Sequence, residues 1–136
     1  MSDQNNNCAP LAWRSTRIKR VVRSTLAAEA IALNNGCDDS VYLGHIMMGL
    51  NKTTPSKSIP IVAYTDNKST IDAVNSTTLV DDRKLRLEIS ALRQYHDTKE
   101  IDIRKVPGKD NISDVLTKRG ASNKSLLSVI TSGSFQ

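Results

Sequence analysis

Aromatic residues and cysteines are scarce in this chain, and each shortage restricts the class of protein it can be. Aromatics make up 4% of the 136 residues, so the core must be built from Leu, Ile, Val and Ala. Cys8 and Cys37 are two thiols without CxxC spacing or nearby paired histidines, which argues against both a zinc site and a disulfide framework. We therefore expect an intracellular protein of a reducing compartment, the cytoplasm or the nucleus.

Long apolar runs are missing as well. No run approaches the roughly 20 residues that a membrane-spanning helix requires, and residues 1–7 (MSDQNNN) are expected to form a polar N-terminal turn rather than a secretory signal. A membrane is therefore not an expected partner. Positive charge, in contrast, is in excess, because 19 Lys and Arg face 14 Asp and Glu and the formal net charge is +5. This balance favours an anionic partner such as nucleic acid.

The spacing of apolar residues predicts a single α/β domain with a largely parallel sheet. Near-continuous hydrophobicity over residues 59–65 (IPIVAYT) is typical of an interior parallel strand. Ser24 or Thr25 is expected to cap a long helix that ends near Leu50. The expected order is a strand at 8–13, that helix, a loop at 51–58, the strand at 59–65, helices at 67–75 and 81–96, a strand at 100–106, a short helix from 111 or 113 to 118, and a last helix at 122–130.

Three carboxylates are candidates for chemistry. Asp66 stands where the strand at 59–65 stops, and functional groups of open α/β sheets collect at the carboxyl ends of strands. From spacing alone, the simpler interpretation is that Asp66 caps the helix beginning at Asn67. Glu29 lies one turn into the long helix, and Asp114 lies in the short helix after PGKDNIS. Taken singly, each of these two is expected to be a surface carboxylate.

The segments around these carboxylates change that interpretation. Residues 13–30 (WRSTRIKRVVRSTLAAEA) contain a W-x-S segment, a basic patch and an S-T pair ahead of Glu29. Residues 64–69 (YTDNKS) contain D-N-x-S, and residues 112–118 (ISDVLTK) contain D-x-L-T-K. In this order the three segments resemble the ribonuclease H domain of copia-type retrotransposon Pol polyproteins. The resemblance covers residues 8–122, and residues 123–136 are expected to form a C-terminal helix and tail.

This resemblance implies a ribonuclease H-like fold, a mixed sheet with flanking helices. It also implies that Glu29, Asp66 and Asp114 are catalytic and occupy three of the family's four acidic metal-binding positions. The implied cofactor is Mg²⁺ or Mn²⁺, because carboxylates supply the hard oxygen ligands that these ions prefer. The implied activity is endonucleolytic hydrolysis of the RNA strand of an RNA/DNA hybrid.

The implied hybrid partner also gives roles to residues near the carboxylates. Cations ahead of the Glu29 helix would contact phosphates, although a solvated basic turn is the alternative. Asn67 and Ser69 would contact a sugar hydroxyl or phosphate, although capping at the start of the helix explains both at least as well. Trp13 is expected to anchor the core, because it lies in a predicted strand without aromatic companions. The candidate nucleic-acid ligands are Arg14, Arg17, Lys19, Arg20, Arg23, Asn67 and Ser69.

One part of the family's pattern is missing from the sequence. The family's domain opens with two strands before the W-x-S strand, and the first of them holds the fourth carboxylate. Residues 1–7 leave no room for either strand, so we expect an N-terminally truncated domain with impaired activity. The reverse transcriptase portion of a polyprotein and a second copy of the chain are candidate partners. The alternative function is a non-catalytic nucleic-acid-binding remnant of a retroelement, and an integrase or transposase is a weaker third hypothesis.

Overall fold

The computed structural model describes residues 9–19, 21–50, 59–113, 120 and 124–132. The chain divides into two compact units, which are described one at a time. The larger unit is Arg20–Val106, and the second unit consists of Met1–Lys19 together with Pro107–Gln136. Glu29 and Asp66 therefore belong to the same unit.

Helix α1 (Thr25–Leu50) is the longest element and begins where the sequence supplies a cap. The Ser24 hydroxyl accepts a hydrogen bond from the Ala27 main-chain N–H at 3.1 Å, so Ser24 is the capping residue. Ala27, Ala30 and Cys37 are buried in the core. The helix predicted from Ser24 to about Leu50 is confirmed.

Strands β1 (Ile61–Thr65) and β2 (Ile101–Lys105) form a two-stranded parallel sheet. Ile61 is paired with Ile101, and Thr65 with Lys105. Parallel strands need a crossover connection, and here two helices supply it. The predicted α/β class and the predicted parallel pairing of the strands are thus confirmed.

Strand β1 is not the interior strand that its apolar composition predicts. In the described part of the chain its one neighbour is β2. Val62 and Tyr64 are 40% and 54% exposed, whereas Ile61 and Ala63 pack against the core. The apolar run therefore has one covered and one open face, which its hydrophobicity alone does not reveal.

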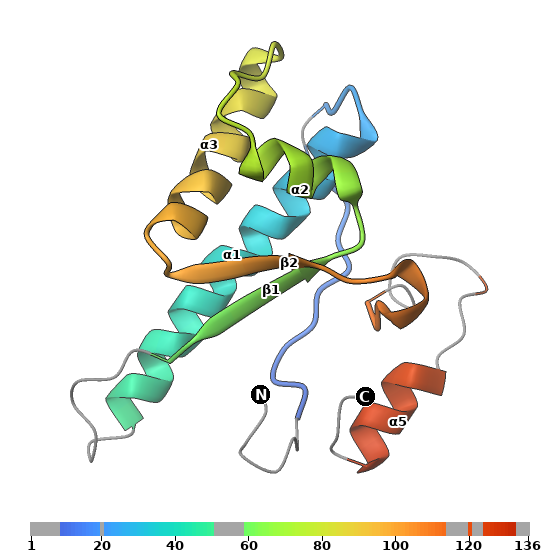
Figure 1. Cartoon of the computed structure of the whole chain (residues 1–136). Coiled ribbons are helices and arrows are strands. Elements are labelled where there is room, and N and C mark those ends of the chain that lie inside the picture. The colour runs from blue at the N-terminus through green and yellow to red at the C-terminus, as the bar shows by residue number, and fades with distance from the viewer. Residues whose placement is uncertain (1–8, 20, 51–58, 114–119, 121–123, 133–136) are drawn as a thin grey trace. The chain divides into compact units, whose positions relative to one another are not determined.

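Helices α2 (Lys68–Asn75) and α3 (Arg83–Asp97) connect the two strands. Leu85, Ile89 and Leu92 are buried on one face of α3, as their spacing predicts. Figure 1 shows α1 running along the sheet in the direction opposite to β1, while α2 and α3 lie together on the side of β2. Apolar side chains from these helices and from β2 form one core.

The second unit contains the 3₁₀ helix η1 (Gly108–Asp110) and helix α5 (Lys124–Ser132), the latter close to the predicted last helix. The strand predicted at residues 8–13 is wrong for residues 9–13, which have no regular structure. Pro10 has no N–H to give to a sheet, and the two described strands pair with each other. Trp13 is 76% exposed, so its predicted role as a core anchor is also wrong.

Three of the expected elements lie outside the described residues, namely the polar turn at 1–7, the loop at 51–58 and most of the short helix ending at 118. None of the helices that the structure describes combines the length and hydrophobicity of a membrane span.

Candidate metal and nucleic-acid site

Asp66 occupies the position that the sequence predicts, directly after the last residue of β1. It is half-buried, and it comes between the buried Thr65 and the start of α2. The Thr65 carbonyl accepts a hydrogen bond from the Val106 N–H at 2.9 Å, which holds this end of β1 against the residue that follows β2. Asp66 is therefore presented at the carboxyl edge of a parallel sheet, where ligand-binding groups of α/β proteins collect.

The cap of α2 is Asn67, not Asp66. Asn67 Oδ1 accepts hydrogen bonds from the Thr70 main-chain N–H at 2.9 Å and from the Thr70 hydroxyl at 3.1 Å. The interpretation of Asp66 as the helix cap is thus wrong, because the next residue satisfies the free N–H of the first turn. Within the described residues, the Asp66 carboxylate has no hydrogen bond or ion pair. Neither carboxylate oxygen of Asp66 is used by the cap of α2.

Glu29 projects from α1, the helix that runs opposite to β1 (Figure 1). The two elements come together at Gly44, where a methyl group would lie 3.5 Å from Cδ1 of Ile61. From that point, α1 extends about 22 Å back to Glu29 at 1.5 Å per residue, and β1 extends about 17 Å forward to Asp66 at 3.3 Å per residue. These two lengths differ by roughly one helical turn, so Glu29 and Asp66 lie at about the same level when measured along the helix and the strand.

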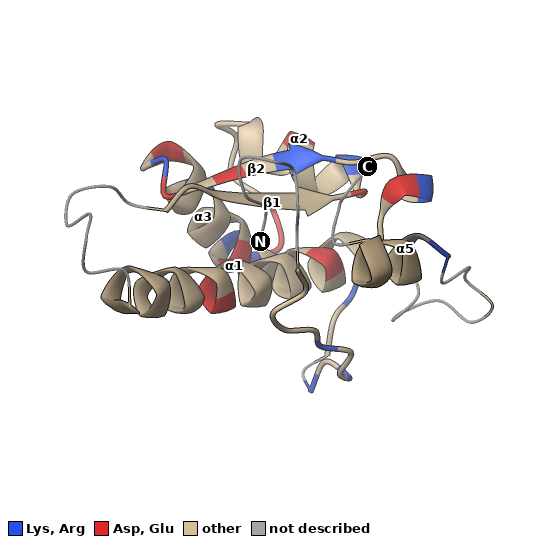
Figure 2. Cartoon of the chain, turned by 90° about the horizontal axis from the view of Figure 1, so that it is seen from below, with Lys and Arg blue, Asp and Glu red and all other residues tan. Residues whose placement is uncertain are grey.

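Helix α1 is an acidic element in a chain whose net charge is positive. Its sequence includes Glu29, Asp38 and Asp39 and contains no Lys or Arg, although the whole chain has a net charge of +5. Figure 2 shows the acidic positions of α1 in red. Glu29 is half-buried and already makes an interaction within the structure. Asp38 and Asp39 lie nine and ten residues beyond Glu29, about 14 Å along the helix, so they add little to the electrostatic field at Glu29.

Asp114, the third predicted metal ligand, lies outside the described residues. Among the described residues, no three His, Cys, Asp or Glu side chains come together as a metal-binding group. Of the three predicted metal ligands, the structure therefore describes two, Glu29 and Asp66. Carboxylate oxygens are the donor type that Mg²⁺ and Mn²⁺ prefer, so each of the two residues is chemically suited to a divalent cation.

The predicted phosphate ligands are distributed over both units. Arg14, Arg17 and Lys19 are exposed in the second unit, and Arg23 is exposed immediately before α1 in the larger unit. Arg20 lies outside the described residues. The four described cations are accessible, and Arg23 lies six residues before Glu29, just ahead of α1.

The other two predicted contacts have different surroundings. The Asn67 side chain is committed to capping α2, so its amide oxygen is not free for a sugar or a phosphate. Ser69 is exposed in the first turn of α2 and remains a candidate contact.

Two residues beside Asp66 were not predicted from the sequence, Thr65 and Thr70. Thr65 is 6% exposed and Thr70 is fully buried, and both hydrogen bond to Asn67. The signal was available in part, because Asn is a preferred helix cap whose side-chain oxygen accepts a hydrogen bond from the main-chain N–H two or three residues later. The burial of both hydroxyls follows from packing and has no local sequence signature.

Comparison with known proteins adds no relative to this description. No protein-family model matches the chain, and neither the curated proteins nor the solved structures include a match.

Proposed function

We propose that this chain is a ribonuclease H-like domain derived from a copia-type retrotransposon. Its proposed activity is the metal-dependent hydrolysis of the RNA strand of an RNA/DNA hybrid, with Glu29, Asp66 and Asp114 as metal ligands and catalytic residues. The observation that carries the proposal is the placement of Asp66. This residue directly follows a parallel strand and is relieved of capping by Asn67, and the lengths of α1 and β1 from the Gly44–Ile61 contact put Glu29 at roughly the same level along the sheet.

Each described residue of the proposed site has a distinct task. The carboxylates of Glu29 and Asp66 would hold Mg²⁺ or Mn²⁺, which when bound activates water and neutralises charge on the scissile phosphate. Arg23, exposed before α1, would contact a phosphate of the hybrid and orient the backbone. Ser69 would accept or donate a hydrogen bond at the sugar–phosphate backbone from the first turn of α2.

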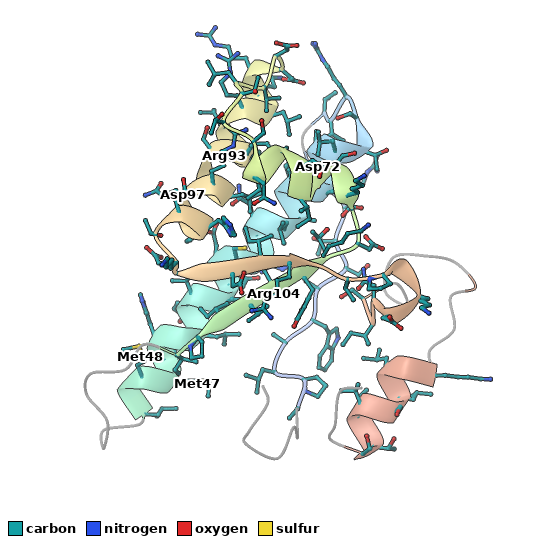
Figure 3. The ribbon with its side chains drawn as sticks, viewed as in Figure 1. Met47, Met48, Asp72, Arg93, Asp97 and Arg104 are labelled. Carbon is teal, nitrogen blue, oxygen red and sulfur yellow. The ribbon has the colours of Figure 1, made fainter. Side chains whose placement is uncertain are left out.

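The test is cleavage of an RNA/DNA hybrid in Mg²⁺ and in Mn²⁺, with two matched variants of the full chain. Asp66→Asn keeps the shape of the side chain and removes its charge, so we expect cleavage to fall about 100-fold, as when one charge-stabilising group leaves an active site. Asp72→Asn removes the same charge from an exposed position on α2 and should cleave like the wild type (Figure 3). Equal activity in Asp66→Asn and the wild type would contradict the assignment of the site.

The exposed cations favour a second candidate, binding of nucleic acid without cleavage. Arg17, Lys19 and Arg23 are all exposed. If they neutralise phosphates, the logarithm of the binding constant should fall linearly with the logarithm of salt concentration, and each neutralised phosphate should add roughly 0.9 to the steepness of that fall. A triple variant that replaces them with Gln should bind a fluorescent hybrid more weakly and with a shallower salt dependence.

The control for that measurement is a second charge-matched change elsewhere. Replacing Arg83, Lys84 and Lys99 with Gln removes three exposed cations from α3 and the turn after it. Salt-dependent binding that needs only the first set, together with no cleavage by the wild type, would favour this second function over the nuclease.

A further inference from the structure

Resting on the proposed function, we propose that the Thr70 hydroxyl is a positioning group for the metal ligand Asp66 and acts through Asn67. Asp66 lies between Thr65 and Asn67, and hydrogen bonds connect these two neighbours to each other and to Thr70. Asn67 N–H donates to Thr65 Oγ1 at 3.3 Å on one side, and Asn67 Oδ1 accepts from Thr70 on the other. The main chain on both sides of Asp66 is thereby fixed.

The helix cap does not require the hydrogen bond from the Thr70 hydroxyl. The Thr70 main-chain N–H already donates to Asn67 Oδ1 at 2.9 Å, and this one bond satisfies the capping function. The hydroxyl adds a second bond to the same oxygen, at 3.1 Å, from a side chain that is fully buried. A valine would fill the same volume without a polar group to satisfy, so capping and packing alone do not call for a hydroxyl here.

The second bond fixes the direction of the Asn67 amide. One hydrogen bond leaves the amide free to turn about it, whereas two donors at different angles restrain the plane of the carbonyl. If the Asn67 amide turned away, the Asp66 carboxylate one residue earlier would become the nearest acceptor for the free N–H groups of α2. These groups attract a carboxylate strongly, because they carry the positive end of the helix dipole. The Thr70 hydroxyl therefore keeps the Asp66 carboxylate out of the helix cap, so that it can bind a metal ion.

The experiment measures Mn²⁺ binding to the full chain by electron paramagnetic resonance, with the metal alone as the probe and the free energy of unfolding measured beside it. Thr70→Val removes the hydroxyl at nearly constant volume, and we expect about tenfold weaker Mn²⁺ binding, the loss typical of groups that orient metal ligands. Thr70→Ser keeps the hydroxyl and should restore the affinity to within about threefold of the wild type. Wild-type affinity in Thr70→Val would overturn the proposal.

A matched control distinguishes a positioning role of Thr70 from a purely structural one. Val74 is buried on the same helix and takes no part in the hydrogen-bonded group, so Val74→Ala should lower stability and leave Mn²⁺ affinity unchanged. Equal loss of affinity in Val74→Ala and Thr70→Val would show that general loosening of α2 is responsible, and this too would overturn the proposal.

Asp66→Asn distinguishes this inference from the proposed function. If Asp66→Asn loses Mn²⁺ and Thr70→Val does not, the site stands and the positioning role is wrong. If neither substitution changes Mn²⁺ binding, or if the wild type binds none, both the metal site and the positioning role are wrong.

Discussion

The Asn34 side chain of α1 donates two hydrogen bonds to Glu88 of α3. Asn34 Nδ2 lies 3.1 Å from the Glu88 main-chain oxygen and 2.7 Å from Glu88 Oε2. Asn34 is 7% exposed, and its own Oδ1 is buried without a hydrogen-bond partner in the described part of the chain. The contact between the two helices therefore depends on a donor at this position, because both groups that Asn34 meets are acceptors.

Replacing that donor with a carboxylate should destabilise the larger unit. In Asn34→Asp a buried negative charge faces the Glu88 carboxylate and two acceptors lose their donor, so we expect a loss of about 1–3 kcal/mol at neutral pH. Urea unfolding measures the loss. Asn35→Asp places the same charge one residue along α1 at an exposed position and should change stability by less than about 0.5 kcal/mol. Equal losses in the two variants would contradict the role given to Asn34.

Truncation of a buried leucine in α3 should have a larger effect. Leu92 is fully buried in the core, so Leu92→Ala leaves a cavity and should lower the free energy of unfolding by about 2–5 kcal/mol. Leu87 lies on the same helix and is 74% exposed, which makes Leu87→Ala the matched control, with an expected change within about 0.5 kcal/mol. Thermal or urea unfolding of the two variants tests which face of α3 is buried in the core. Similar losses in the two variants would contradict the assignment of Leu92 to the buried face and Leu87 to the exposed face.

Arg93 connects α3 to the end of α2, toward which it points in Figure 3. Its Nε and Nη2 atoms donate to the Ala73 carbonyl at 3.0 and 2.7 Å, and Nη2 also donates to the Thr78 carbonyl at 2.9 Å. A lysine keeps the charge but cannot reproduce this planar set of donors. We expect Arg93→Lys to cost about 1–2 kcal/mol of stability in urea unfolding.

The control for Arg93 is the exposed arginine that begins α3. Arg83→Lys makes the same chemical change at the other end of the helix and should be neutral within about 0.5 kcal/mol. A neutral Arg93→Lys would mean that the guanidinium contributes only its charge.

Alkaline pH should weaken the contact between α3 and α1. The Tyr95 hydroxyl donates to Asp38 Oδ1 at 2.5 Å, and this bond, with smaller effects from burial and the Asp38 charge, raises the pKa of Tyr95 from 10 to about 12. Below pH 10 the phenol is protonated in both folded and unfolded chains, so the full stabilisation is present. Between pH 10 and about 12 the unfolded chain releases this proton first, so the stabilisation is lost as pH rises.

Tyr95→Phe removes this dependence. We expect its free energy of unfolding to fall less steeply from pH 10 to 12 than that of the wild type, as followed by urea unfolding at each pH. Tyr42→Phe removes a hydroxyl from an exposed position on α1, leaves the Tyr95–Asp38 bond in place, and should keep the wild-type slope. A wild-type slope in Tyr95→Phe would show that this bond does not govern alkaline stability.

Much of the larger unit was predictable because its signals are local. The Ser24 cap, the spacing of Leu85, Ile89 and Leu92, and the end of β1 before Asp66 each depend on a few neighbouring residues. The position of Asp66 in the candidate site therefore follows from the sequence. The sequence did not show that Asp66 is free of the capping role, because both Asp66 and Asn67 are suitable caps. Only the contacts of Thr70 with Asn67 decide between them.

The remaining differences have one physical origin, which is contact between residues far apart in the sequence. Whether an apolar strand is interior or open depends on what lies beside it, so IPIVAYT alone could not show that Val62 and Tyr64 are exposed. Residues 9–13 resemble a strand in composition, but a strand also needs a hydrogen-bonded neighbour.

The sequence by itself determined the order of the elements from α1 to β2, the ends of α1 and the chemical character of the carboxylates, because capping and periodicity act within a few residues. Only the tertiary structure decided that α1 runs opposite to β1 and that two buried threonines hydrogen bond to Asn67, the residue after Asp66. Those relationships depend on the direction in which α1 crosses the sheet, and packing between distant segments sets that direction.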